Sequence, residues 1–156
     1  MLTADGPRLL EFNCRMGDPE CQPLVARLEG DLAEALANLA AGKLSGSSLK
    51  WSADASVCVV LASAGYPGKA ETGKPITGIV AAGKLEGVTV FHAGTKTDAG
   101  KLVTAGGRVL GVTARGHDLR AAVERAYVAV EKIRFDGMHF RRDIGARGLK
   151  KLHARS

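Results

Sequence analysis

The sequence predicts an α+β fold, in which a strand hairpin and helices precede a small, mainly antiparallel β domain with one packed helix. Glycine accounts for 20 of the 156 residues, well above the ~7% typical of proteins, so tight turns between short strands are expected. Residues 55–63 form a continuous β-rich apolar run that suits a strand buried on both faces. Residues 117–133 repeat apolar side chains at three- and four-residue spacing, which predicts an amphipathic helix.

The N-terminal segment predicts a hairpin followed by helix. Residues 5–7, Asp-Gly-Pro, are a turn signal, and residues 8–14 are expected to form the strand that follows it. A helix is expected to begin with Asp18 as its N-cap. The leucines that follow at helical spacing are interrupted by Gly30 and Asp31. The pattern therefore predicts either a kink or a second helix capped by Asp31.

A small, polar stretch ending at Ser48 is the best candidate for a linker. It divides the chain into residues 1–44, a linker at 45–50 and a second unit at 51–156. Beyond the buried strand, the second unit is expected to form short strands separated by glycine-containing turns, with a basic tail at the end. These strands are predicted at residues 76–80, 88–92, 101–104, 108–114 and 138–142.

The positive charge of the chain is concentrated at its end. The net charge is +6, and the segment from Arg134 onward holds seven basic residues against two acidic ones. Such a segment suits nucleic acid, a phosphate-bearing ligand or a solvated face, and charge alone does not choose among them. Seven aromatic residues in the whole chain offer little for a base-stacking platform, so nucleic acid is not the expected partner.

The cysteines and the apolar runs indicate a cytoplasmic protein. Cys14, Cys21 and Cys58 are odd in number and lack zinc-binding spacing, which fits a reducing compartment. No apolar run approaches the ~20 residues of a membrane span. The first residues also lack a charged start followed by an apolar segment, so neither secretion nor a membrane partner is expected.

Three polar side chains at alternate positions are the strongest candidate site. On the strand expected over residues 8–14 and just beyond it, Glu11, Asn13 and Arg15 project from one face. A carboxylate and an amide oxygen side by side are ligands that suit Mg²⁺, and the guanidinium beyond them suits a phosphate or carboxylate. A polar face on an edge strand is the alternative that this spacing leaves open.

The run of residues 9–20, LLEFNCRMGDPE, resembles the last catalytic strand and following turn of the phosphoribosylamine-glycine ligase (glycinamide ribonucleotide synthetase) family. Glu-x-Asn-x-Arg alone is shared by many ATP-grasp ligases. Four later motifs resemble the C-terminal domain of this one family, in the same order, so the resemblance covers nearly the whole chain. They are SAGYPG at 63–68, FHAGT at 91–95, GGRVLGVT at 106–113 and RRDIG at 141–145.

The resemblance implies ATP-dependent joining of glycine to 5-phosphoribosylamine through a glycyl phosphate, in purine biosynthesis. Glu11 and Asn13 match the family's ligands for Mg²⁺ or Mn²⁺, and Arg15 matches an arginine near the acyl phosphate. Residues 1–44 correspond to the C-terminal end of an ATP-grasp domain, and residues 51–156 to the family's C-terminal domain. The missing N-terminal part of the same enzyme is then a partner, and the chain by itself is expected to be an inactive fragment. A basic module that binds nucleic acid or phosphorylated partners is the alternative.

Three further features carry weaker predictions. Residues 106–108, Gly-Gly-Arg, suit either a close approach of the C-terminal sheet to the active-site cleft or a simple turn between strands. His92, at a strand end, is expected to be a hydrogen-bonded structural residue rather than a general base. Asp143 and Arg147 are expected to form an ion pair.

Overall fold

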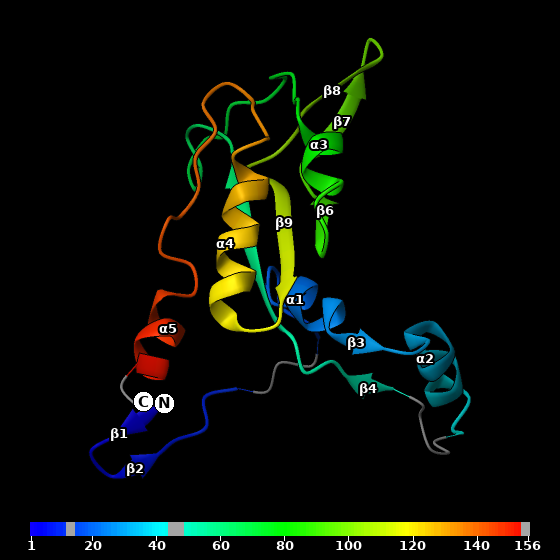
Figure 1. Cartoon of the computed structure of the whole chain (residues 1–156), viewed down its shortest axis with the longest axis vertical. Helices are drawn as coiled ribbons and strands as arrows, with labels where there is room; N and C mark the ends of the chain where they lie inside the picture. The colour runs from blue at the N-terminus through cyan, green and yellow to red at the C-terminus, as the bar shows by residue number, and fades with distance from the viewer. Residues whose placement is uncertain (12–14, 44–48, 154–156) are drawn as a thin grey trace.

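The computed structural model describes residues 1–11, 15–43 and 49–153. Within them the main sheet has three antiparallel strands in the order β5-β9-β6 (Figure 1). These strands are β5 (Ala55–Ala62), β6 (Val88–His92) and β9 (Arg108–Gly116). The six residues from Val109 to Ala114 are all buried, because β9 lies in the centre of the sheet and both of its faces are covered. The α+β prediction and the three expected strands are confirmed.

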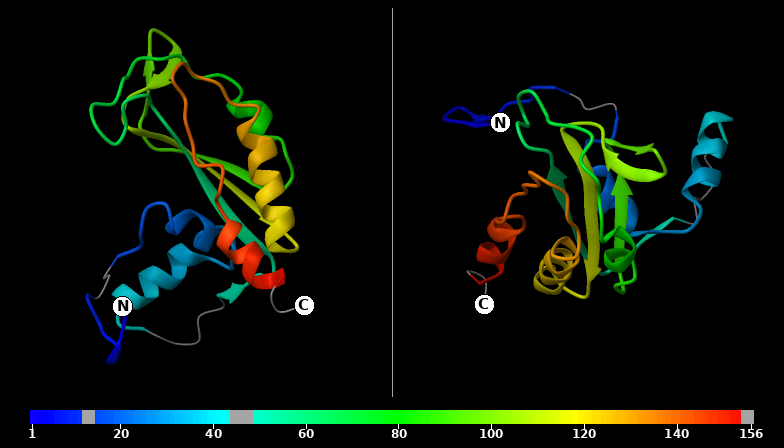
Figure 2. Two further views of the ribbon diagram at one scale, coloured as in Figure 1. Left: turned by 90° about the vertical axis from the view of Figure 1, so that its left-hand side faces the viewer. Right: turned by 90° about the horizontal axis from the view of Figure 1, so that it is seen from above.

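Helices cover the two faces of this sheet (Figure 2). α4 (Leu119–Val130) packs on β5 and β9 and buries Ala122, Ala126 and Ala129 against the alternate residues Val57, Val59 and Leu61. The carboxylate of Asp118 caps α4. α1 (Cys21–Ala26) lies against the other face, where Ser56 of β5 donates a hydrogen bond to the carbonyl of Pro23. Val57, Val59 and Leu61 of β5 therefore face α4, and Ser56 faces α1. A strand whose alternate residues are covered on both sides is buried on both faces, as the sequence predicted.

A second hairpin and a short helix complete the C-terminal sheet region. The hairpin consists of β7 (Thr95–Asp98), which the sequence did not reveal, and β8 (Lys101–Thr104), which it did. The strand expected at residues 76–80 is wrong, because Ile79 begins α3 (Ile79–Gly83). Its N-cap, Gly78, has a left-handed φ of 84° and lies tightly against the carbonyl oxygen of Lys132. That conformation turns the chain out of the extended path at this residue.

The C-terminal segment runs back along α4. The strand expected at residues 138–142 is reduced to one bridge, between His139 and Ala62. Further along, the hydroxyl of Tyr127 on α4 donates to the carbonyl of Arg141 at 2.8 Å and accepts from the amide of Ile144 at 3.1 Å. This segment leads into α5 (Ala146–His153), a helix where the sequence predicted only a basic tail.

The N-terminal residues form short elements beside this core. β1 (Leu2–Thr3) and β2 (Gly6–Pro7) form a hairpin, but its turn lies at residues 4–5 rather than 5–7, and residues 8–11, expected as its second strand, belong to no strand. After α1, β3 (Leu28–Glu29) pairs with β4 (Lys50–Trp51), and α2 (Leu32–Ala40) leaves from this pair and stands away from the sheet (Figure 1). The carboxylate of Asp31 accepts from the amide of Glu34 at 2.9 Å. The sequence alternative with two helices and Asp31 as the second cap is therefore the correct one.

Candidate functional site

A hollow of about 680 Å³ opens between the segment that precedes α1 and the start of β9. Its lining comes from residues far apart in the sequence: Arg15, Met16, Gly17, Asp18 and Glu20 on one side and Arg108 on the other. Arg15 ends the Glu-x-Asn-x-Arg motif, and the next four follow it directly. The last belongs to the GGRVLGVT motif, so two of the motifs singled out from the sequence meet at one place.

Arg108 joins the two sides of the hollow. Its Nη1 donates to the backbone carbonyl of Asp18 at 3.0 Å, and its Nη2 lies 3.2 Å from the Asp18 carboxylate. The predicted role of Asp18 as the cap of α1 is wrong, since α1 begins at Cys21 and its N-cap is Glu20. Asp18 is instead bound by Arg108, which lies 90 residues further along the chain.

Of the two interpretations of residues 106–108, the turn between strands is confirmed, and the approach to an active-site cleft stays a prediction. The pair of glycines lies in the turn between β8 and β9, and Gly107 packs so tightly under the ring of Tyr66 that a Cβ there would lie 2.3 Å from a ring carbon. Arg108 then starts β9 and reaches the hollow. The contact that the sequence did not show is the pairing of Arg108 with Asp18.

The predicted site residues are placed in part. Arg15 is exposed, lines the hollow and donates a long bond of 3.4 Å to the carbonyl of Met16. Glu11 is exposed and is not among the residues that line this hollow. Asn13 lies outside the described residues. The shared face of positions 11, 13 and 15 stays a prediction. Residues 8–11, the described part of the expected strand, do not form a strand.

The donor set near the hollow fits a cation that binds few protein atoms. Among the residues that the structure describes, no three His, Cys, Asp or Glu side chains are grouped closely enough to hold a metal ion. The exposed carboxylate of Glu11 is open to a cation from solvent. Mg²⁺ commonly binds through one or two carboxylates or amides and completes its shell with water and substrate phosphates. The described residues are therefore compatible with such a metal.

His92 lies close to the same region. It borders a small recess shared with Asp18 and Arg108. Its Nδ1 lies 3.1 Å from the hydroxyl of Thr95, so the side chain is hydrogen-bonded within its own turn. This agrees with the structural role predicted for His92.

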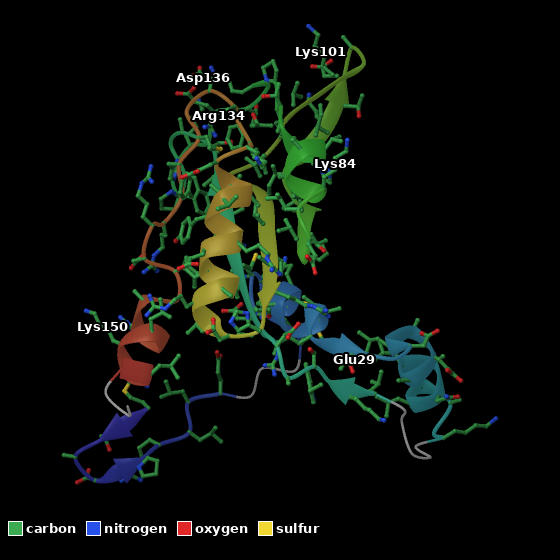
Figure 3. All side chains as sticks on the ribbon, viewed as in Figure 1. Glu29, Lys84, Lys101, Arg134, Asp136 and Lys150 are labelled. Atoms are coloured by element: carbon green, nitrogen blue, oxygen red, sulfur yellow. The ribbon has the colours of Figure 1, made fainter. Side chains whose placement is uncertain are left out.

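The basic C-terminal segment is partly neutralised by its own contacts. Asp143 pairs with Arg141 through a fork of two bonds, at 2.9 and 2.6 Å, rather than with Arg147 as predicted. The hydrogen bonds from Arg141 hold the pKa of Asp143 below its ordinary value. Arg142 stacks over the ring of Phe140, 4.9 Å from its centre. Lys150 extends from α5 on the side away from the sheet (Figure 3).

Comparison with known proteins identifies the family. Residues 56–147 match the family described as phosphoribosylglycinamide synthetase, C domain. A chloroplastic phosphoribosylamine–glycine ligase of Arabidopsis thaliana is 54% identical over 93% of this chain, and one of Rhodopirellula baltica is 51% identical over 96%. The crystal structure of the phosphoribosylamine–glycine ligase of Thermotoga maritima superimposes with a TM-score of 0.72 at 37% identity, over 92% of this chain.

The chain spans only part of these relatives. It covers 28% of the Arabidopsis protein, 34% of the Rhodopirellula protein and 34% of the Thermotoga chain. In the described ranges, no helix is both long and apolar enough to cross a membrane. The agreement in sequence and fold, over nearly the whole of this chain, shows that it belongs to the phosphoribosylglycinamide synthetase family, to whose C domain its residues 56–147 correspond.

Proposed function

We propose that this chain is the C-terminal part of an enzyme that joins glycine to 5-phosphoribosylamine with ATP and yields glycinamide ribonucleotide for purine biosynthesis. The observation that supports it most is the hollow in which Arg15 and the turn after it face Arg108 of the family-matched domain. The guanidinium of Arg15 beside a solvent-open hollow suits anionic substrates such as a nucleotide phosphate, a carboxylate or an acyl phosphate, whereas that of Arg108 is paired with Asp18.

The reaction divides into two substitutions. A glycine carboxylate oxygen attacks the γ-phosphorus of ATP, ADP leaves, and glycyl phosphate forms. The amine of 5-phosphoribosylamine then attacks the acyl carbon, phosphate leaves, and the nitrogen loses a proton. Arg15 is the catalytic residue in this proposal, because a guanidinium at the hollow stabilises the negative charge that develops on the transferred phosphoryl group and on the acyl oxygen.

Glu11 and Asn13 are the proposed ligands for Mg²⁺ or Mn²⁺. When bound there, the cation would supply charge neutralisation for the phosphates of ATP. The exposure of Glu11 supports this assignment, since a buried or paired carboxylate would not be open to a metal that arrives with the nucleotide.

The remaining partner is the part of the enzyme that this chain does not cover. Every residue of α2 is at least partly exposed, including Leu36 at 53% and Leu39 at 51%, and Trp51 of the neighbouring strand is 59% exposed. An apolar helix face of this kind usually packs against another element. The exposure of this face supports the proposal that the chain is inactive alone. The rest of the enzyme, about two-thirds of a relative's length, would complete it.

The domain division keeps its proposed boundaries. Residues 1–44 form the end of an ATP-grasp domain, 45–50 the linker and 51–156 the C-terminal domain. The start of the family match at residue 56 supports the last of these. We also propose a cytoplasmic location, consistent with the free thiols of Cys21 and Cys58.

A chimera tests the function. The Arabidopsis residues that precede the matched region are fused ahead of Met1, and formation of ADP from ATP is measured with glycine and 5-phosphoribosylamine in the presence of Mg²⁺. Turnover that needs all three substrates is expected, and Glu11→Ala should abolish it by removing a metal carboxylate. Glu86→Ala is the matched control, since Glu86 is an exposed carboxylate between α3 and β6. A folded chimera without turnover contradicts the proposal.

The alternative, a basic module for nucleic acid or phosphorylated partners, has its own test. Binding of a labelled oligonucleotide or phosphopeptide by the chain is measured against salt, because phosphate neutralisation produces a steep fall of affinity. The pairing of Arg141 with Asp143 and the stacking of Arg142 on Phe140 leave fewer free charges for such a partner. Absence of binding at low salt eliminates the alternative.

A further inference from the structure

Arg108 begins the buried central strand of the main sheet. It is the first residue of β9, and the residues that follow it, Val109 and Leu110, are 0% and 1% exposed. On its other side Gly107 is packed beneath Tyr66. The backbone that carries the guanidinium therefore has little freedom to shift.

The turn that Arg108 contacts has few other fixed points. Its backbone is closed by one hydrogen bond, from the amide of Cys21 to the carbonyl of Gly17 at 2.9 Å. Gly17, Asp18 and Glu20 are all partly or fully exposed. Arg108 binds Asp18 twice, at the backbone carbonyl and at the carboxylate. Two bonds from one planar group fix an orientation as well as a position.

A second arginine of the same strand holds the other end of this segment. Arg115 donates to the carbonyl of Ala26, at the end of α1, at 3.2 Å, and pairs with Asp54 at 3.6 Å. Segment 15–27 is thus attached to β9 at both ends. Only the attachment at Arg108 lies in the hollow, and it is three residues from Arg15.

We propose that Arg108 is a positioning residue of the active site. Its two contacts with Asp18 fix the position of the turn that follows the Glu-x-Asn-x-Arg motif. The position of this turn determines how Arg15 is presented to the hollow. The proposal rests on the function proposed above for Arg15. In this proposal the C-terminal sheet contributes to the reaction, because it orients the turn that follows Arg15 from outside the domain to which that turn is assigned.

The expected kinetic effect is on turnover rather than on substrate affinity. A displacement of about 1 Å in a catalytic group can cost ~100-fold in rate, and loss of an outer partner of a site commonly costs about 10–100-fold. Arg108→Met in the chimera is therefore expected to lower kcat about 10–100-fold while the KM for glycine changes less than about threefold. Arg108→Lys keeps the charge without the fork, so it should recover only part of kcat.

Hydrogen exchange of this chain supplies a readout that does not depend on activity. The amide of Cys21 reports the closure of the turn, because its partner is the carbonyl of Gly17. Arg108→Met should raise the exchange rate of this amide about tenfold, as expected from loss of a charge-assisted bond. Asp18→Asn keeps the backbone carbonyl and should show a smaller increase.

Arg115→Met is the matched control, since it removes an arginine from the same strand with the same two kinds of partner. It should leave kcat and the Cys21 amide close to wild type. The proposal is overturned if Arg108→Met lowers kcat no more than Arg115→Met does, or if the Cys21 amide exchanges at the wild-type rate. A chimera that is inactive even without these substitutions refutes the proposed function, and the exchange measurement still decides whether Arg108 holds the turn.

Discussion

Replacing Gly78 with alanine is expected to destabilise the C-terminal domain more than an ordinary surface substitution. Gly78 has a left-handed φ of 84°, and a Cβ added there would lie 1.8 Å from the carbonyl oxygen of Lys132. That carbonyl cannot simply move away. Ile133, the next residue, is fully buried, and Arg134 exchanges two backbone hydrogen bonds with Thr77.

The magnitude follows from these contacts. The left-handed backbone costs about 1–2 kcal/mol for a residue with a Cβ. Relief of the clash requires the bridge between Thr77 and Arg134 to open, which loses two hydrogen bonds of about 1 kcal/mol each. The sum is about 3–4 kcal/mol, a large part of the stability of a typical domain. At about 2–4 °C per kcal/mol, the melting temperature should fall by roughly 6–16 °C.

Gly83→Ala is the control, measured in the same urea and thermal unfolding experiments. Gly83 ends α3, and a Cβ there would meet nothing within 4 Å. It should be neutral or stabilise by about 0.4–1 kcal/mol, because alanine restricts the unfolded chain. If the free energies of unfolding of the Gly78 and Gly83 variants agree within about 0.5 kcal/mol, the close approach of Gly78 to Lys132 is refuted.

Three further outcomes are expected. Asp118→Ala removes the cap of α4 and should lower the free energy of unfolding by about 1 kcal/mol in urea titration. The bonds from Arg141 lower the pKa of Asp143 from its ordinary 3.8, so this pair stabilises the fold above that pH and the contribution is lost as the pH falls through the lowered pKa. Asp143→Asn should therefore reduce the melting temperature at neutral pH and have no effect in strong acid. Burial raises the pKa of the Cys58 thiol, so mass spectrometry after alkylation of the native chain should find Cys21 modified and Cys58 unmodified until the chain unfolds.

The elements that the sequence predicted well are those determined by local pattern. β5 and β9 are apolar runs buried on both faces, and α4 combines a 3.6-residue period with Asp118 at its start. Each of these signals depends on neighbours within a few residues. The division of the leucine-rich stretch at Asp31 is of the same kind, since the cap and its acceptor bond span three positions.

The elements that the sequence missed depend on distant contacts. Residues 76–80 have the composition of a strand, and a helix forms there because Gly78 turns against Lys132, 54 positions later. Asp18 looks like a helix cap until Arg108 is brought beside it. Neither partner can be identified by spacing, because only the tertiary fold brings each pair together.

The candidate site divides in the same way. Arg15 could be predicted as a site residue from its place in the Glu-x-Asn-x-Arg pattern, and the structure lines the hollow with it. The contribution of Arg108 was predictable only as one of two interpretations of a glycine pair. Asn13 lies outside the described residues, so its pairing with Glu11 stays a prediction.

The order of strands in the main sheet also constrains how the protein is made. β5 and β6 do not pair with each other, and both depend on β9, whose last residue is Gly116. During synthesis the first two strands leave the ribosome with apolar surfaces and no partner until the third follows. Because such unpaired strands are prone to aggregate, a nascent chain halted before Arg108 should need a chaperone to stay in solution, and one released after α4 should not.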